Sequence, residues 1–217
     1  MTPKYLQKIG GLCSIFEGLI YITAFIIYGG LLEYPDKNAT AREELAFLSE
    51  NYITLSLLNF TSYILFGVLL SIVVLAIHKR IQKDLPHLSK LAFIFGAIWV
   101  GLVIASGMIT NIGLNSILEI GNTSPEKAME TWSSVSIVSE GLGGGNEIVG
   151  GIWVLLISLV AFNKKTFPKP LTILGILVGT AGILTIYPLD LFTEIFGISQ
   201  IIWFIWIGIT MIRKPIL

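Results

Sequence analysis

The stretch YITLSLLNFTSYILFGVLLSIVVLAI, residues 52–77, contains no charged residue and decides the fold class. The hydrocarbon core of a bilayer is about 30 Å thick, and about 20 residues of α-helix cross it. The apolar residues of this stretch are continuous, whereas a strand of an outer-membrane barrel would alternate polar and apolar residues. A helix is required instead, because it satisfies its backbone hydrogen bonds within lipid. The stretch therefore predicts a membrane-spanning helix.

Five further apolar runs follow the same pattern. They cover about residues 9–28, 91–111, 140–162, 171–187 and 191–211. The fourth run along the chain reaches spanning length only if the Gly-rich segment 140–147 joins the helix, and the fifth lies at the lower limit of about 17 residues. The sequence predicts an all-α bundle of six transmembrane helices, which forms a single domain over residues 1–217.

The composition excludes a soluble protein. Hydrophobic residues make up 54% of the chain and charged residues 13%, with a mean hydropathy of +0.82. Soluble domains carry about 25% charged residues. The lipid bilayer is therefore the expected partner. The net charge of zero gives no reason to expect a nucleic-acid partner.

The positive charges predict the orientation of the chain. Most of the 14 Lys and Arg residues fall at the N-terminus, in the second and fourth loops, and at the C-terminus. These residues are Lys4, Lys8, Lys79, Arg80, Lys83, Lys90, Lys164, Lys165, Lys169, Arg213 and Lys214. Because positive loops stay in the cytoplasm, we expect both termini to be cytoplasmic in a multi-pass protein of the cell membrane. An even number of spans agrees with that expectation.

Two outer segments carry signals for the start of a helix. Thr40 and Glu43 form a capping-box pattern, which predicts a short interfacial helix before the second span. Ser124, Pro125 and Glu126 are typical of a helix N-terminus. Two interpretations of residues 112–147 stay open, a surface helix and a re-entrant segment.

Small residues spaced by about four predict close helix packing in two spans. The third span contains Ala97, Gly101 and Ala105 at that spacing. In the fifth span, Gly175 and Gly179 form a GxxxG motif that Gly182 continues.

Polar residues within the apolar runs are the candidate binding residues. An ionised carboxylate at the bilayer centre costs at least about 2.5–3.5 kcal/mol, so such groups face the bundle interior and usually have a role. We expect a polar cavity that opens to the outer face, with a floor near Glu17 and walls from Asn59, Ser106 and Glu147. Its ligand would be a proton, a cation or a cationic small molecule. The candidates are Glu17, Tyr21, Asn59, Tyr63, Ser106, Asn111, Asn146 and Glu147.

A structural interpretation of the two acids stays open beside the binding one. A protonated Glu can donate a hydrogen bond to a neighbouring helix and hold the bundle together. The chain would then be a structural or regulatory membrane protein that packs against a membrane partner or a second copy of itself.

Catalytic patterns are missing from the sequence. The only two histidines, His78 and His87, lie together near the cytoplasmic edge. Cys13 is the single cysteine, and we interpret it as a small packing residue. Metal sites need several ligands at one depth, and no nucleophile, zinc or phosphate-loop motif is present. We expect no enzymatic activity, no cofactor and no metal site.

Several Gly-rich and Pro-rich segments carry a resemblance to a known family. They are KIGGL at residues 8–12, Asp36 with ATA at 39–41, GGNEIVGGIW at 144–153, FPKPL at 167–171, and Leu174, Gly175 and Gly179. Together they resemble small bacterial integral membrane proteins of domain of unknown function family 4386. The resemblance covers nearly the whole chain and implies a bacterial inner-membrane protein with six or seven helices. It implies no activity and no catalytic residues.

Overall fold

The computed structural model describes residues 2–144, 147–187 and 189–215, and every regular element in them is a helix. This confirms the all-α fold class. Three of the elements are short π-helical segments, labelled η. The order is α1 (Pro3–Ile26), η1 (Ile27–Leu31), α2 (Ala41–Glu50), α3 (Tyr52–Asn59), η2 (Phe60–Leu65), α4 (Phe66–Ile81), α5 (Pro86–Gly121), α6 (Pro125–Ser139), η3 (Glu140–Gly144), α7 (Ile148–Lys164), α8 (Lys169–Leu184) and α9 (Asp190–Arg213).

Five helical stretches of the described chain are long and apolar enough to cross a membrane. They are Pro3–Leu31, Tyr52–Ile81, Pro86–Gly121, Leu191–Arg213 and Pro125–Lys164, the last of which joins α6, η3 and α7 and includes residues 145–146, outside the described residues. Helix α8 is also apolar, but its 16 residues fall below the length of the other five. The chain is a multi-pass membrane protein.

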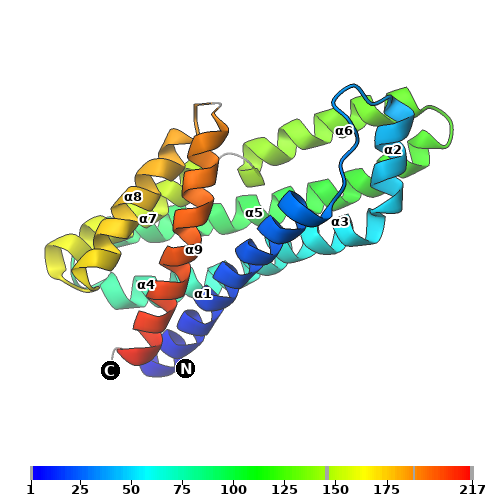
Figure 1. The fold of residues 1–217 in the computed structure, drawn as a ribbon. Coiled ribbons are helices and arrows are strands. Elements are labelled where there is room, and N and C mark those ends of the chain that lie inside the picture. The colour runs from blue at the N-terminus through cyan, green and yellow to red at the C-terminus, as the bar shows by residue number, and fades with distance from the viewer. Residues whose placement is uncertain (1, 145–146, 188, 216–217) are drawn as a thin grey trace.

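Six helices form a closed ring in which each packs on the next. The order around the ring is α1, α4, α5, α7, α8 and α9, and α9 returns to pack along α1. The two chain ends lie together at one end of the ring (Figure 1). Arg80 links them there, because its guanidinium donates to the side-chain oxygen of Gln7 at 3.0 Å and to the Lys214 carbonyl at 2.9 Å.

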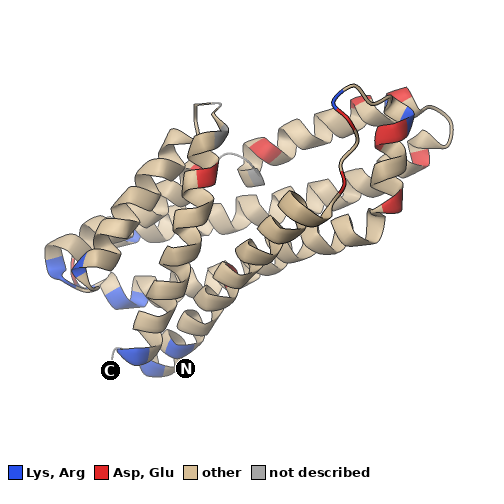
Figure 2. Cartoon of the chain, viewed as in Figure 1, with Lys and Arg blue, Asp and Glu red and all other residues tan. Residues whose placement is uncertain are grey.

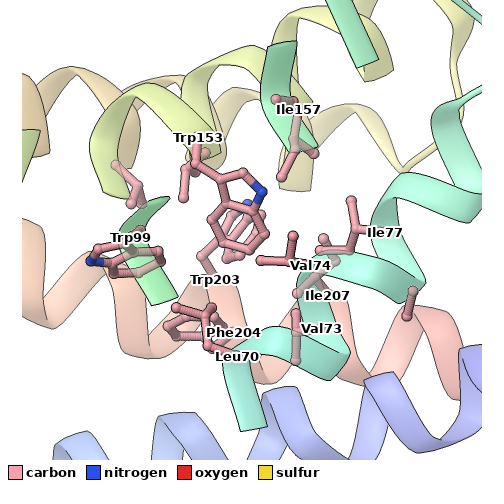
Figure 3. Packing of buried hydrophobic residues seen from close by; sticks show 14 of the residues in the cluster. Leu70, Val73, Val74, Ile77, Trp99, Trp153, Ile157, Trp203, Phe204 and Ile207 are labelled. Carbon is pink, nitrogen blue, oxygen red and sulfur yellow. The ribbon is translucent and has the colours of Figure 1, made fainter. Parts of the chain in front are cut away.

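Aromatic rings fill the centre of the ring of helices (Figure 3). Trp99 of α5 packs against Trp153 of α7, with ring centroids 5.6 Å apart. Trp153 meets Trp203 of α9 edge to face at 5.7 Å, and Phe204 lies parallel to Trp99 at 6.5 Å. Aliphatic residues of α4 such as Leu70 complete this core, which is fully buried.

Helix α5 extends beyond the predicted span 91–111 at both ends. Its 36 residues extend about 54 Å, well beyond a hydrocarbon core of about 30 Å. The extra length is stabilised by a second core, in which α6 and α2 pack on the C-terminal part of α5. The buried members of this core are Leu48, Leu55, Leu114, Ile117 and Ala128.

The two predicted helix starts in the outer segments are confirmed. Thr40 and Glu43 form both hydrogen bonds of a capping box at the start of α2. The Ser124 side chain accepts a hydrogen bond from the Lys127 amide at the start of α6. Helix α6 runs back alongside the C-terminal part of α5 (Figure 1).

The prediction that small residues allow close helix packing is confirmed for α8 and is wrong for the predicted face of α5. A Cβ on Gly179 would lie 2.7 Å from the Leu155 backbone nitrogen, so α7 and α8 touch through backbone atoms. A Cβ on Gly101 would meet no atom within 4 Å. Helix α5 instead makes its close approach through Gly96, beside Trp153, and Gly107, beside Tyr63.

Charge divides the molecule into two ends (Figure 2). Lysines and arginines gather at the end that holds both termini and the loops that follow α4 and α7. Most acidic residues lie at the opposite end, around α2 and the outer parts of α5 and α6. We call these the basic end and the acidic end.

Candidate binding cavity

A cavity of about 250 Å³ lies between α1, η2, α5 and α9, on the side of the aromatic core away from the basic end. Seven aromatic residues contribute to its lining: Tyr21, Phe25, Tyr28, Tyr63, Phe66, Trp99 and Phe196. The other lining residues are Ile20, Ala24, Ser62, Val103, Gly143, Glu147, Thr193 and Gly197. Glu147 is the only charged group in this set.

The three segments labelled η contribute to the cavity wall, and η3 is a kink at Gly143 rather than a regular π-helical turn. Tyr28 belongs to η1, Ser62 and Tyr63 belong to η2, and Gly143 belongs to η3. A π-helical turn inserts an extra residue into a helix, and such turns occur frequently at functional sites. No sequence pattern indicated these segments, although they determine which side chains face the cavity.

The helix is interrupted where Glu147 joins the wall. Gly143 has φ 135° and ψ 17°, a left-handed conformation that favours glycine. Glu147 is itself non-helical, with φ −101° and ψ 19°, and α7 begins at the next residue. Glu140 and Glu147 therefore do not share a face of one continuous helix. Glu140 is exposed, whereas Glu147 lines the cavity.

A hydrogen bond fixes the backbone of Glu147 beside the cavity. The Glu147 amide donates to Thr185 Oγ1 at 2.9 Å, and the Thr185 hydroxyl donates to the Gly182 carbonyl at 2.7 Å. The interrupted backbone is thus attached to the C-terminal end of α8. This attachment holds the acid at one place in the wall.

Two polar atoms on the cavity lining lack partners. Glu147 Oε2 and Trp99 Nε1 are buried, and neither makes a hydrogen bond within the described part of the chain. The indole N–H lies beside the carboxylate but does not meet it with hydrogen-bond geometry. Buried polar groups almost always find a partner. Two such atoms on one cavity therefore indicate a place for a ligand or for water.

A deeper pair of polar side chains lies beyond the cavity, toward the basic end. Glu17 is 0% exposed, and neither of its carboxylate oxygens has a partner among the described residues. It precedes Tyr21 by about one helical turn on α1. Gln200 of α9 is also 0% exposed, and its amide oxygen and nitrogen are both unpartnered within the described chain. Phe196, which lines the cavity, precedes Gln200 by about one helical turn on α9.

Helices α1 and α9 hold these two residues at similar depth. Ser14 donates to the Phe204 carbonyl at 2.7 Å, and a Cβ on Gly18 would lie 3.4 Å from the Ile201 carbonyl. Glu17 therefore lies level with residues 201–204, directly after Gln200. One feature of the sequence could have indicated Gln200, because it is an amide in the middle of the apolar run 191–211.

Comparison with family models gives one match. The model of the family described as Domain of unknown function (DUF4386) matches residues 9–213. The chain belongs to this family. A search of curated proteins finds no match, and a search of solved structures finds none. The DUF4386 assignment agrees with a multi-pass membrane protein and supplies no activity.

Three of the predicted binding residues lie elsewhere in this DUF4386 protein. Ser106 is fully buried, and its hydroxyl bonds to the Ser139 carbonyl at 3.0 Å and hydroxyl at 2.7 Å, which attaches α6 to α5. Asn111 donates to the Ser56 carbonyl at 3.3 Å. Asn59 accepts from Tyr28 and lines a second cavity. The predicted single cavity walled by Asn59 and Ser106 is therefore wrong.

The remaining predicted residues divide between the cavity and its surroundings. Tyr21, Tyr63 and Glu147 line the cavity together. Glu17 is buried next to it, as described above. Asn146 lies outside the described residues. Tyr21, Tyr63 and Glu147 come together from three separate elements, which are α1, η2 and the segment before α7.

The second cavity, of about 460 Å³, lies at the acidic end of the DUF4386 fold. Helices α2 and α6 and the segment after η1 surround it, with Phe47, Trp132 and Asp36 in its lining. Tyr28 lines both cavities. We call them the inner cavity, beside Glu147, and the outer cavity.

Metal binding has no support within the described residues. Among residues 2–144, 147–187 and 189–215, no group of three or more His, Cys, Asp or Glu side chains could hold a metal ion. The inner cavity offers one carboxylate and aromatic rings, which do not form a cage of oxygen ligands.

Proposed function

We propose that this DUF4386 chain binds a proton, a cation or a cationic small molecule in the inner cavity, with Glu147 as the anchor. The observation that carries the proposal is the buried, unpartnered Oε2 of Glu147 in the wall of a cavity of about 250 Å³. A buried carboxylate without a partner is costly. A bound proton or cation removes that cost.

The proposal includes six spans with both termini in the cytoplasm of a bacterial cell. Helix α8 would be the sixth span, since it packs between α7 and α9 in the ring. Its 16 residues extend about 24 Å, so it would cross a locally thinned bilayer. Support for the orientation comes from the lysines and arginines at the end where both termini meet.

In this orientation the inner cavity would face outward. The basic end is closed by a side-chain network in which Gln7 donates to the Ala76 carbonyl at 2.6 Å and accepts from Arg80. The aromatic core around Trp99 and Trp153 separates that network from the cavity. A ligand would then reach Glu147 from the side of the membrane away from the cytoplasm. Transport would require a second conformation in which the basic end opens.

The alternative is a structural or regulatory protein whose acids hold helices together or support a membrane partner. That role calls for a hydrogen bond from each acid to a neighbouring helix. Neither carboxylate oxygen of Glu17 makes such a bond among the described residues. The described bond of Glu147 to a neighbouring helix comes from its backbone amide. These observations favour binding over a structural role.

Thermal unfolding of the purified protein in detergent tests the proposal. The wild type is measured at acid and neutral pH, with inorganic cations and with amines, beside Glu147→Gln, Glu17→Gln and the exposed control Glu140→Gln. We expect a rise in melting temperature, with at least one of these conditions, that Glu147→Gln abolishes and Glu140→Gln retains. A response that is identical in wild type and Glu147→Gln under every condition would overturn the proposal and favour the structural role.

A further inference from the structure

The lining of the inner cavity narrows the class of ligand. Aromatic rings of the lining come from several elements, among them Tyr21 of α1, Tyr63 of η2, Trp99 of α5 and Phe196 of α9. Tyr21 and Phe66 meet edge to face with centroids 5.4 Å apart, and Phe66 lies 6.0 Å from Trp99. These three rings therefore form a continuous aromatic wall, and Tyr63 and Phe196 add further rings to the lining.

The lining contains one acidic side chain, Glu147. Glu147 lines the same cavity as Tyr21 and Tyr63. No Lys, Arg or His contributes to the lining. An anion in this cavity would be repelled by the Glu147 carboxylate and by the negative faces of the rings, and the lining contains no positive side chain to offset that repulsion.

The size and chemistry of the cavity argue against the smallest cations. Hard metal ions take six or more oxygen ligands, or retain several waters, and the lining supplies one carboxylate. A proton does not need a cavity of about 250 Å³. An apolar cavity of about 150 Å³ is enough to bind benzene in another protein. The inner cavity, at about 250 Å³, therefore has room for a small organic molecule.

We infer that the inner cavity binds an organic ammonium ion, with its alkylated nitrogen held between the aromatic wall and the Glu147 carboxylate. The inference rests on the proposed function and names the ligand class for the same cavity. Aromatic cages bind alkylated ammonium groups because the negative ring faces attract the charge and the rings replace water around the alkyl groups. The carboxylate supplies the opposite charge that such a cage needs inside a membrane.

The buried Nε1 of Trp99 adds a second feature to the ligand. This donor lines the same cavity and lacks a partner within the described chain. A hydroxyl or carbonyl oxygen on the ammonium compound would accept its hydrogen bond. Choline, which carries a hydroxyl two carbons from its ammonium nitrogen, has both features and serves as a probe.

Isothermal titration calorimetry of the protein in lipid nanodiscs tests the inference. The probes are choline, benzyltrimethylammonium, sodium chloride and 3,3-dimethylbutan-1-ol, in which carbon replaces the ammonium nitrogen of choline. We expect both ammonium ions to bind at least about tenfold more tightly than the neutral alcohol, which corresponds to about 1.4 kcal/mol. Glu147→Gln should weaken ammonium binding about tenfold or more, while Glu140→Gln should leave it unchanged.

A matched pair of substitutions tests the aromatic wall. Tyr63→Leu removes a ring and should weaken binding of benzyltrimethylammonium about tenfold, whereas Tyr63→Phe keeps the ring and should change binding by less than about threefold. Equal losses for both variants would contradict the aromatic cage. Both variants keep the Cβ that lies beside Gly107, and their melting temperatures in detergent report whether each one folds.

The outcomes separate the ligand class from the proposed function. If the neutral alcohol binds as tightly as choline, or if neither ammonium ion binds while pH or sodium still acts through Glu147, the ammonium inference is wrong and the proposed function stands. If nothing in the thermal panel or the titrations depends on Glu147, both are wrong.

Discussion

The Tyr28 hydroxyl donates a hydrogen bond to Asn59 Oδ1 at 3.1 Å, at the place where the inner and outer cavities meet. Tyr28 lines both cavities, and Asn59 lines the outer one. Tyr28 belongs to η1, and Asn59 is the last residue of α3 before η2. Two helix irregularities thus come together at the boundary between the cavities.

Removing this hydrogen bond is expected to lower stability. Tyr28→Phe leaves the buried Asn59 oxygen without its donor, a loss of about 1–3 kcal/mol. Tyr5→Phe, at an exposed tyrosine near the N-terminus, should have little effect. Thermal unfolding in detergent measures both. Equal melting temperatures for the two variants would contradict the role of the Tyr28–Asn59 bond.

The contact between α7 and α8 leaves no room for an added methyl group at Gly151. A Cβ on Gly151 would lie 2.8 Å from the Gly179 carbonyl oxygen, a backbone atom that cannot rotate away. Gly151→Ala should therefore destabilise the protein by about 1–3 kcal/mol. Gly101→Ala provides the matched control on α5, where the methyl group meets open space. Alanine there should be neutral or stabilising by up to about 1 kcal/mol, and the opposite ranking in thermal unfolding would show that the packing is wrong.

Thr185 is expected to position Glu147. Thr185→Val keeps the side-chain shape but removes the acceptor for the Glu147 amide, which should cost about 1–3 kcal/mol and weaken any ligand that Glu147 binds. Thr180→Val is the control, because the Thr180 hydroxyl bonds only within its own helix and is exposed. Melting temperature and ligand affinity are measured for both. If Thr185→Val changes stability but leaves affinity as in Thr180→Val, Thr185 does not position the acid.

The capping box of α2 is expected to make that helix sensitive to acid. Hydrogen bonds to Glu43 from the backbone amide and then the hydroxyl of Thr40 lower the pKa of the Glu43 carboxyl. A lowered pKa in the folded state contributes stability that is present above the unfolded pKa of about 4.3 and is lost as pH falls through the folded pKa.

Hydrogen exchange of the α2 amides at neutral and acid pH measures this effect. Protection should fall toward acid pH in the wild type, and Glu43→Gln should reduce the dependence. Glu44→Gln, one residue further along α2, is the control. A pH dependence that is the same in Glu43→Gln and wild type would rule out the capping box as its source.

The sequence predicted the fold class because lipid imposes a simple rule. Charge-free runs such as residues 52–77 have to become helices, and their lengths identified the apolar helices of the structure. It also predicted the start of α2, since a capping box is a local pattern. The end of α5 could not be predicted, because residues 112–121 remain helical through contacts with Val135 and Leu45, which lie far away in the sequence.

The candidate site was only partly accessible to sequence reasoning. Glu17 and Glu147 could be selected because acids in apolar runs are rare. Ser106 and Asn111 looked equally suitable by depth, yet their partners on α6 and α3 use them for packing. Trp99 and Gln200 were missed, since whether a polar atom has a partner depends on neighbouring helices. The π-helical turns have no sequence pattern that would have indicated Tyr28 or Ser62 as wall residues.

Thiol reactivity inside the inner cavity tests the central claim most directly. Cys13 is the only cysteine, so Cys13→Ala gives a background for Ser62→Cys in the cavity wall and for Ser134→Cys on the exposed face of α6. Each is reacted with methanethiosulfonates that carry either a trimethylammonium or a sulfonate group. The account predicts that the cationic-to-anionic rate ratio is higher for Ser62→Cys than for Ser134→Cys, and that Glu147→Gln removes the difference. Equal ratios at the two positions, or a difference that survives Glu147→Gln, would contradict a cation site beside Glu147.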